Sequence, residues 1–182
     1  MLRKLTLLAL VAAGPVFAQE DGPGPNLVID VAGGTSGTVV IDLLADVAPK
    51  HVAQITALAT AGAYDNVLFH RVIDGFMAQT GDVQYAVAGG DTSMAGMGGS
   101  DMADLPAEFS DISFDRGVVG MARSQDPNSA NSQFFIMFAP GEFLNGQYTV
   151  VGRVISGMEV VDAIAKGEPP ETPDRMAKVT VQ

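Results

Sequence analysis

The chain has 182 residues, of which 47% are hydrophobic and 17% are charged. This suits a single domain with a sizeable core, and it does not fit collagen, a coiled coil or a wholly disordered chain. There are 10 Lys and Arg residues against 21 Asp and Glu residues, a net charge of −11. That balance argues against nucleic-acid binding, because phosphate contacts need clustered cations. The absence of cysteine excludes disulfides, thiolate zinc sites and a cysteine nucleophile.

The first 18 residues have the pattern of a secretory signal peptide. Arg3 and Lys4 form a basic start, residues 5–17 form an apolar run, and Ala18 closes it as a small residue. The run is shorter than the roughly 20 apolar residues of a good membrane span, although an uncleaved anchor is the alternative. We expect cleavage near Ala18, a periplasmic or secreted protein, and no stable membrane insertion afterwards.

Residues 19–25 are rich in Gly and Pro and read as a flexible lead-in to a domain over residues 26–182. Two β-rich runs, at 26–31 and 38–44, are separated by a Gly-rich stretch and predict a hairpin. Further strands are expected at 67–73, 76–80, 117–122, 132–138, 148–154 and 176–182.

Two helices are expected between these strands. Pro49 suits the first turn of one helix, and Gly62 suits its end. The apolar residues that share the face of this helix are Val52, Ile55, Leu58 and Ala59. The second helix carries Met158, Val161, Ile164 and Ala165 on one face, with Gly167 as its cap.

The order of elements, about eight strands and two helices with no βαβ alternation, favours a mainly β fold closed as a barrel or packed as a sandwich. Residues 84–106 stand apart, because Gly and Met are frequent there and no periodicity is present. We interpret them as a long, flexible, irregular loop.

Several common sites are absent from the sequence: it has no G-x-S-x-G elbow, P-loop or G-x-G-x-x-G. His51 and His70 do not form a metal pair and read as ordinary structural or surface residues. Acidic residues that do not match a calcium loop read as a solvated surface: Asp101, Asp104, Glu108, Asp111 and Asp115. No metal or cofactor is therefore expected.

Three methionines of the long loop leave an alternative open. Met94, Met97 and Met102 carry thioethers, which suit Cu(I). Gap filling or substrate contact explains them more simply.

Two stretches carry chemistry. In the first, residues 69–82, Arg71 is a charge inside an apolar strand, and Gln79 shares a strand face with Met77. In the second, residues 132–138, Phe134 and Phe135 must point to opposite faces. One of these rings can fill a barrel core while the other faces outward.

These stretches resemble the cyclophilins. The motif F-H-R-x-I-x-G-F-M-x-Q-x-G-D at 69–82 and S-Q-F-F-I at 132–136 are joined by F-L-N-G at 143–146, in the family's order. The resemblance covers nearly the whole chain after residue 25 and is closest to the exported bacterial branch. It implies a closed eight-stranded antiparallel barrel capped by two α-helices.

The resemblance also implies a function: peptidyl-prolyl cis–trans isomerase activity during the folding of exported proteins. Rotation about a peptide bond costs roughly 18–20 kcal/mol, so the catalyst must favour the twisted, non-conjugated state. By resemblance Arg71 would stabilise that state as the catalytic residue, and Gln79 would hold Arg71 or the substrate backbone. A structural ion pair is the other interpretation of Arg71. A proline-binding chaperone or scaffold with little turnover is the alternative function.

The remaining site residues also follow from the resemblance. The apolar socket for the proline ring would be formed by Phe76, Met77, Phe135 and Leu144. The groove before the proline would be lined by Ala122, Gln133 and the backbone of Arg123. Plain core packing is the alternative for Phe76, Met77, Phe134, Phe135 and Leu144. Phe143 and Tyr148 stand where many members carry Trp and His, so cyclosporin is expected to bind weakly. The expected partners are proline-containing or unfolded chains, bound by a monomer.

Overall fold

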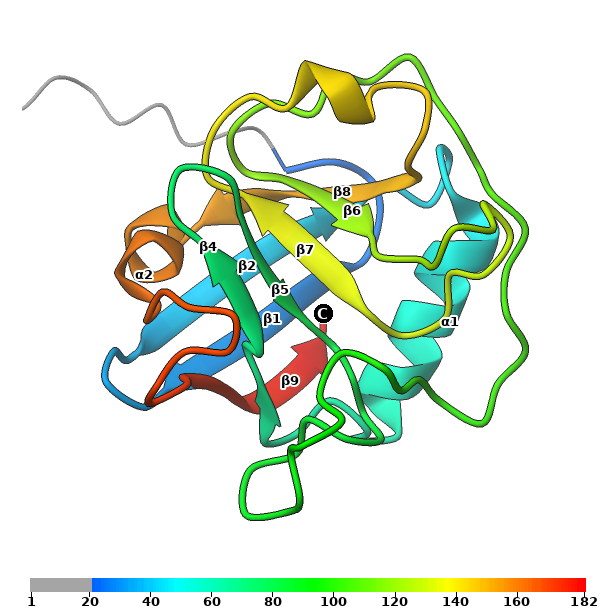
Figure 1. Cartoon of the computed structure of the whole chain (residues 1–182). Coiled ribbons are helices and arrows are strands. Elements are labelled where there is room, and N and C mark those ends of the chain that lie inside the picture. Colours follow the sequence, from blue (N-terminus) through cyan, green and yellow to red (C-terminus); the bar gives the residue numbers. More distant parts are fainter. Residues whose placement is uncertain (1–20) are drawn as a thin grey trace, which may run out of the picture.

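The structure, a computed structural model, describes residues 21–182, so the predicted signal peptide lies outside the described residues. One antiparallel sheet dominates it (Figure 1), with the strand order β3-β9-β1-β2-β8-β6-β7-β5-β4. The strands are β1 (Asn26–Ala32), β2 (Gly37–Leu43), β3 (Val67–Leu68), β4 (Arg71–Ile73), β5 (Met77–Thr80), β6 (Val118–Met121), β7 (Phe134–Met137), β8 (Val150–Ser156) and β9 (Arg175–Val181). The helices are α1 (Pro49–Thr60), α2 (Met158–Ala163) and the 3₁₀ helix η1 (Glu142–Leu144).

The sheet is curled, because its two edge strands are consecutive in the chain. Only Phe69 and His70 separate β3 from β4, yet β3 pairs with β9 and β4 pairs with β5. The single strand predicted at 67–73 is therefore broken at these two residues. Leu68 of β3 bonds to two segments outside its ladder: its N–H donates to the Ala86 carbonyl of the long loop (2.7 Å), and its carbonyl accepts from the Thr80 hydroxyl of β5 (2.9 Å).

The prediction of a mainly β, antiparallel fold with two α-helices is confirmed. The described residues form a curled sheet of nine strands. Among them no ladder joins β3 to β4, so the predicted closed eight-stranded barrel is not confirmed. The hairpin of β1 and β2 is confirmed, with Val31 opposite Gly37. The remaining predicted strands differ from the observed ones mainly at their ends.

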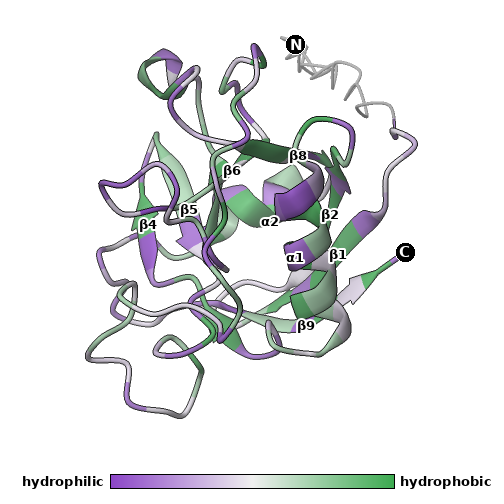
Figure 2. Cartoon of the chain, turned by 90° about the vertical axis from the view of Figure 1, so that its right-hand side faces the viewer, coloured by the Kyte–Doolittle hydropathy of each residue, from purple (hydrophilic) through white to green (hydrophobic). Residues whose placement is uncertain are grey.

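The main core lies inside the curl. Alternate residues of β1 and β2 are buried there, among them Leu27, Ile29 and Ile41. Helices α1 and α2 lie at opposite ends of the sheet (Figure 1), α1 against β9 and α2 against β2. Figure 2 colours the chain by hydropathy: β6 and β8 are largely green (hydrophobic), other strands mix green and purple, and purple (hydrophilic) residues are frequent in the connecting loops.

Helix α1 follows its prediction. It begins at Pro49 and buries the predicted apolar face, and Gly62 follows its end with φ +72°. The N–H of Gly62 donates to Ala59, and the N–H of Ala63 donates to Leu58. This is the Schellman pattern of a glycine-terminated helix.

Helix α2 is shorter than predicted. It ends at Ala163, so Ile164 and Ala165 lie beyond it, and Gly167 does not cap it. The physical reason is tertiary pairing. The N–H of Ala165 donates to the Asp174 carboxylate (2.9 Å), and Gly167 pairs with Val72 on the outer edge of β4.

Residues 84–106 contain no helix or ladder strand, as expected, but they are tethered. The Asp82 carboxylate accepts hydrogen bonds from the backbone N–H groups of Gln84, Tyr85, Gly96 and Gly98, at 2.7–3.1 Å. The description of this segment as merely flexible is therefore wrong. One buried carboxylate fixes its course.

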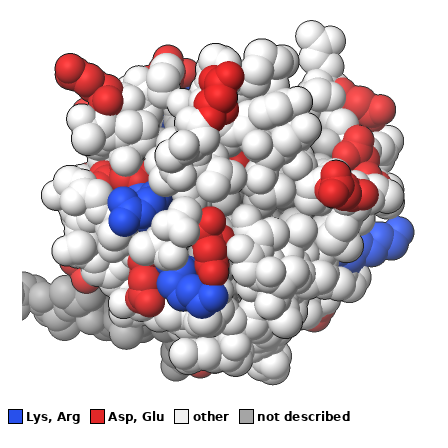
Figure 3. Space-filling model, turned by 90° about the horizontal axis from the view of Figure 1, so that it is seen from below, with Lys and Arg blue, Asp and Glu red and all other residues white. Residues whose placement is uncertain are grey.

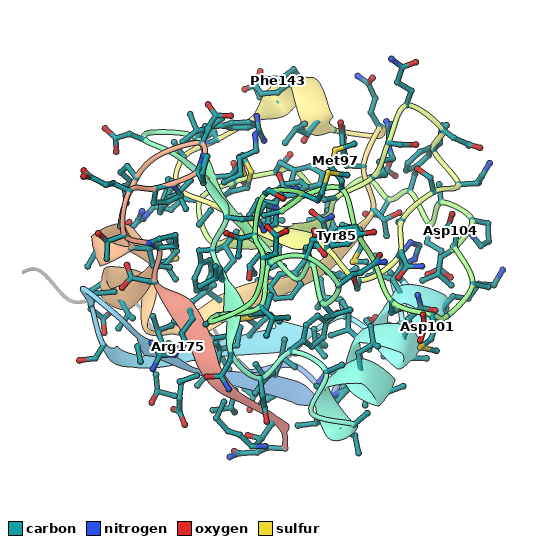
Figure 4. The ribbon with its side chains drawn as sticks, turned by 60° about the horizontal axis from the view of Figure 1, so that its bottom comes forward. Tyr85, Met97, Asp101, Asp104, Phe143 and Arg175 are labelled. Carbon is teal, nitrogen blue, oxygen red and sulfur yellow. The ribbon has the colours of Figure 1, made fainter. Side chains whose placement is uncertain are left out.

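The acidic residues are spread over the surface (Figure 3), and Asp101 and Asp104 are exposed beside α1 (Figure 4), in keeping with a solvated acidic surface. Among the five acidic residues predicted to form that surface, Glu108 is the exception. Its side chain is 13% exposed and accepts hydrogen bonds at the N-terminus of α1, one of them from the buried His51 ring (2.7 Å). Within residues 21–182 no helix is long and apolar enough to cross a membrane.

Candidate active site

The candidate site lies on the outer face of β5, β6 and β7. In β7, Phe134 and Ile136 point into the main core, whereas Phe135 and Met137 join a second apolar cluster with Met77. The prediction that Phe134 and Phe135 point to opposite faces is confirmed. Both rings are buried, so the outward ring is covered by other site residues rather than by solvent.

A cavity of about 300 Å³ opens on this face, and it is called the apolar cavity below because apolar side chains are the majority of its lining residues. Every predicted site residue except Gln133 lines it: Arg71, Phe76, Met77, Gln79, Ala122, Arg123, Phe135, Phe143, Leu144 and Tyr148. They come from three strands, η1 and the loops beside them, so residues far apart in the sequence meet at one place. Among the described residues, the lining of this cavity includes no serine, histidine or carboxylate.

Aromatic rings form the floor and the rim of the cavity. The Phe135 ring stacks on Phe114 at 5.8 Å and meets the edge of Tyr148 at 5.9 Å. At the rim, Phe143 lies 5.5 Å from Phe76, is 66% exposed and projects from η1 (Figure 4). Sequence reasoning missed Phe114, because its spacing gives no sign that it lies under the site.

A glycine makes the aromatic floor possible. Gly120 faces Phe135 across the β6–β7 pair. A Cβ on Gly120 would lie 2.6 Å from ring atoms of both Phe114 and Phe135. The stacked rings therefore occupy the space that any larger residue at this position would need.

The Arg71 guanidinium is held from two sides. Its Nη1 donates to Gln79 Oε1 (3.3 Å), and its Nε donates to Glu168 Oε2 (2.8 Å). Arg71 thus lines the cavity and also makes an ion pair. Glu168 lies 97 residues away, and nothing in the sequence singles it out.

A polar line runs from Arg71 into the neighbouring loop. Gln79 Nε2 donates to Gln133 Oε1 (2.9 Å), and Gln133 Nε2 donates to the carbonyls of Gly96 (3.0 Å) and Gly98 (2.8 Å). The structure thus places Gln79 on Arg71. The side-chain amide of Gln133 is hydrogen-bonded within the protein, and it holds the long loop in place.

A second cavity of about 300 Å³ adjoins the first and shares Gln79, Ala122 and Arg123 with it. Polar residues are more frequent in its lining, which adds Gly96, Met97, Gly98, Ser124, Ser129, Asn131, Ser132 and Gln133. The two cavities form one groove with an apolar and a polar half. Met97 stands at the polar half, 75% exposed (Figure 4).

The side chain of Arg123 also belongs to the site, although the sequence predicted a role only for its backbone. Its guanidinium lies 4.3 Å over the Tyr148 ring, and Nη2 donates to the Gln147 carbonyl (2.9 Å). Because Arg123 lines both cavities, a fixed cation stands where they meet.

His70 lies buried under the long loop, in keeping with a structural histidine. Burial lowers the pKa of His70, although the nearby Asp82 carboxylate opposes this. Among residues 21–182 no group of three or more His, Asp or Glu side chains could hold a metal ion. Met97 and Met102 line different cavities.

Comparisons with known proteins agree with this geometry. Residues 28–181 match the family model described as cyclophilin type peptidyl-prolyl cis-trans isomerase/CLD. A relative from Brucella suis, named a probable peptidyl-prolyl cis-trans isomerase, is 60% identical over 153 residues, covering 80% of this chain and 78% of its own length. Its bacterial source agrees with the bacterial branch of the resemblance.

Solved structures show the same fold. A cyclophilin from Hirschia baltica superposes with a TM-score of 0.74 at 28% identity, covering 89% of this chain and 75% of its own. A cyclophilin-type isomerase from Cryptosporidium parvum, solved in the presence of the dipeptide Ala-Pro, gives 0.73 at 27% identity. That match covers 86% of this chain and 98% of the other.

Proposed function

Because this chain belongs to the cyclophilin-type peptidyl-prolyl cis–trans isomerases, we propose that Arg71 is its catalytic residue and that the apolar cavity holds the substrate proline ring. The reaction itself is rotation about the X-Pro peptide bond. Unaided, that rotation takes tens to hundreds of seconds. It forms no covalent bond, which agrees with a cavity lined by apolar side chains and a guanidinium.

The mechanism follows from the electronic change during rotation. As the bond twists, conjugation is lost and the prolyl nitrogen becomes pyramidal, with a lone pair. Arg71 can donate a hydrogen bond to that nitrogen, or hold the neighbouring carbonyl, through N–H groups that Gln79 and Glu168 do not use. A preorganised donor of this kind stabilises the twisted state more than either planar isomer.

The rest of the groove orients the chain around that bond. Phe76, Met77, Phe135 and Leu144 surround the ring with apolar surface, and Phe143 and Tyr148 complete the rim. The polar cavity beyond Ala122 then receives the residues before the proline, and the Arg123 backbone pairs with them. The Ala-Pro dipeptide named for the related Cryptosporidium parvum structure supports a groove for short proline segments.

One observation carries this proposal: a guanidinium fixed at the wall of an apolar cavity large enough for a proline ring. The test is cis–trans exchange of a capped Ala-Pro peptide, measured by NMR, for Arg71→Ala and Arg71→Lys. We expect a fall in kcat of about 10²–10³ for Arg71→Ala, the effect of losing one preorganised donor. Arg71→Lys should fall nearly as far, since Lys lacks the planar fork.

Arg175→Ala is the matched control. Arg175 lies in β9, away from both cavities, and its variant should keep full activity. Full activity in Arg71→Ala would refute the catalytic role. Peptide binding without acceleration by the unaltered protein would instead make this a proline-binding module.

We also propose that the protein acts on exported chains. The support is the basic start, short apolar run and small-residue end of residues 1–18. Mass spectrometry of the protein from a periplasmic fraction should find an N-terminus at Gln19. An intact Met1 would contradict this.

We further propose that the curled sheet is an eight-stranded barrel closed at residues 67–73. If β3 and β4 are counted as one bent strand, that single strand forms both edges of the sheet. The hydrogen bonds of Leu68 support this proposal. Slow amide exchange at Leu68 would agree with a closed seam, whereas exchange as fast as in a loop would contradict it.

A further inference from the structure

The ion pair between Arg71 and Glu168 indicates a role for Glu168 in the reaction. We propose that Glu168 is a positioning residue, which fixes the plane of the Arg71 guanidinium so that its free N–H groups face the apolar cavity. This inference rests on the proposed catalytic role of Arg71. Glu168 does not line the cavity, so it would act only through Arg71.

The fold places Glu168 opposite Arg71 by backbone pairing. The N–H of Val72 donates to the Gly167 carbonyl, and the N–H of Gly167 donates to the Val72 carbonyl, both at 2.8 Å. In an antiparallel pair, the neighbours of two paired residues also stand opposite each other. Glu168 and Arg71 are such neighbours, so their side chains meet across the edge of β4.

The segment that carries Glu168 is fixed at more than one point. Gly167 has φ +147°, and a Cβ there would lie 2.6 Å from Pro170 Cα. The buried Asp174 carboxylate accepts from the N–H groups of Thr35 and Ala165, both at 2.9 Å. Glu168 is therefore presented by a constrained segment and not by a free loop.

The donor count shows what the ion pair achieves. A guanidinium has five N–H donors in one plane. Glu168 takes the Nε donor and Gln79 takes one Nη1 donor, which leaves three. Two contacts at different points of a planar group fix both its position and its tilt. The remaining donors then keep one direction, which is what catalysis by a preorganised group requires.

Stability does not explain this pair well. The side chains of Arg71 and Glu168 are 41% and 52% exposed, and ion pairs of that kind contribute little to folding. A second possibility is that Glu168 screens the charge of Arg71 from the substrate. The two explanations predict opposite changes in activity. Removing Glu168 lowers the activity if Glu168 positions Arg71, and raises it if Glu168 screens the charge of Arg71.

The test compares Glu168→Gln with Glu171→Gln, which removes the same charge from an exposed residue three positions away. We expect kcat/KM for a capped, uncharged Ala-Pro peptide to fall about threefold to tenfold in Glu168→Gln, mainly through kcat, since misplacing a catalytic group slows the chemical step. Glu171→Gln should stay within experimental error of the unaltered protein. Glu168→Asp, one methylene shorter, should recover part of the loss.

Two further readouts separate positioning from a general structural effect. The Arg71 Nε–Hε signal in ¹H–¹⁵N spectra should shift in Glu168→Gln and not in Glu171→Gln, because the charged acceptor is lost. Salt near 1 M, where screening acts within about 3 Å, should lower the activity of the unaltered protein toward that of Glu168→Gln. The variant itself should respond much less.

Gly167→Ala provides an independent perturbation, because it displaces Glu168 while both charges remain. It should reproduce the loss of kcat and the shift of the Arg71 signal. Activity in Glu168→Gln equal to or above that of the unaltered protein, with Arg71→Ala inactive, would overturn the inference and leave the proposed function standing. Full activity in Arg71→Ala would refute the catalytic role of Arg71, and the catalytic meaning of Glu168 with it.

Discussion

Glu108 is a residue whose loss should lower the stability of this protein without touching the groove. Helix α1 has Ala48 at its N-cap, and no side chain of its own caps it. Glu108 supplies the cap from a distant loop: its carboxylate accepts from the N–H groups of Lys50 (3.1 Å) and His51 (3.2 Å) and from His51 Nδ1 (2.7 Å). A carboxylate there also complements the helix dipole.

We expect Glu108→Ala to lower the free energy of unfolding by about 2–3 kcal/mol. Loss of an N-cap costs about 0.5–2 kcal/mol, and a hydrogen bond to a charged group is worth about 1.5–3 kcal/mol. The variant also leaves the buried His51 Nδ1 without its partner, which adds to the cost. Urea unfolding at pH 7 measures the difference, with Asp111→Ala as the exposed acidic control, expected within about 0.5 kcal/mol of the unaltered protein.

The pH dependence gives a second check. Burial would raise the pKa of Glu108, but the hydrogen bonds from the His51 ring and from the N–H groups of His51 and Lys50 outweigh it and hold the pKa below its ordinary value. The stabilisation is therefore fully present above the unfolded pKa, about 4.3, and is lost as the pH falls through the lower folded value. A difference at pH 7 no larger than that of Asp111→Ala, or one that persists at pH 2, would refute this reasoning.

Three further predictions concern the two faces of β6 and β7 and the rim of the groove. Phe134→Ala should cost about 3–5 kcal/mol of stability and leave kcat/KM intact in the folded fraction. Phe135→Ala should instead weaken Ala-Pro binding at least about tenfold in an NMR titration. Equal binding by both variants would contradict the assignment of the two rings to opposite faces. Gly120→Ala should displace the Phe135 ring and destabilise by about 1–3 kcal/mol in urea, and an unmoved ring signal would count against this. Cyclosporin should inhibit weakly, because Phe143 cannot donate a hydrogen bond, and Phe143→Trp should strengthen inhibition; submicromolar inhibition of the unaltered protein would disprove the argument.

The sequence predicted those parts of the site that depend on strand alternation. Phe134 and Phe135 point to opposite faces because adjacent residues in a strand must do so, and Met77 and Gln79 share a face for the same reason. The motif resemblance supplied residues beyond the strands, such as Leu144. Together, strand alternation and the motif resemblance predict nearly all the residues that line the apolar cavity.

What could not be predicted depends on contacts between distant segments. Glu108 caps a helix 58 residues away, and Glu168 meets Arg71 across 97 residues. Neither residue stands in a motif, and an isolated acid in a loop is indistinguishable from solvated surface. The break of the strand at Phe69 and His70 has the same origin, because only the pairing of β3 with β9 and of β4 with β5 divides that apolar run.

The position of the site on the outside of the sheet explains why so many polar contacts serve to hold loops. Gln79 and Phe135 lie on strands that pair with each other and whose inner faces form the core. The other walls of the groove are loops, and a loop wall is useful only if it is fixed. The buried carboxylate of Asp82 and the amide of Gln133 fix the loop at the polar half. Glu168 fixes the guanidinium at the apolar half in the same way, from a segment that pairs with the free edge of β4.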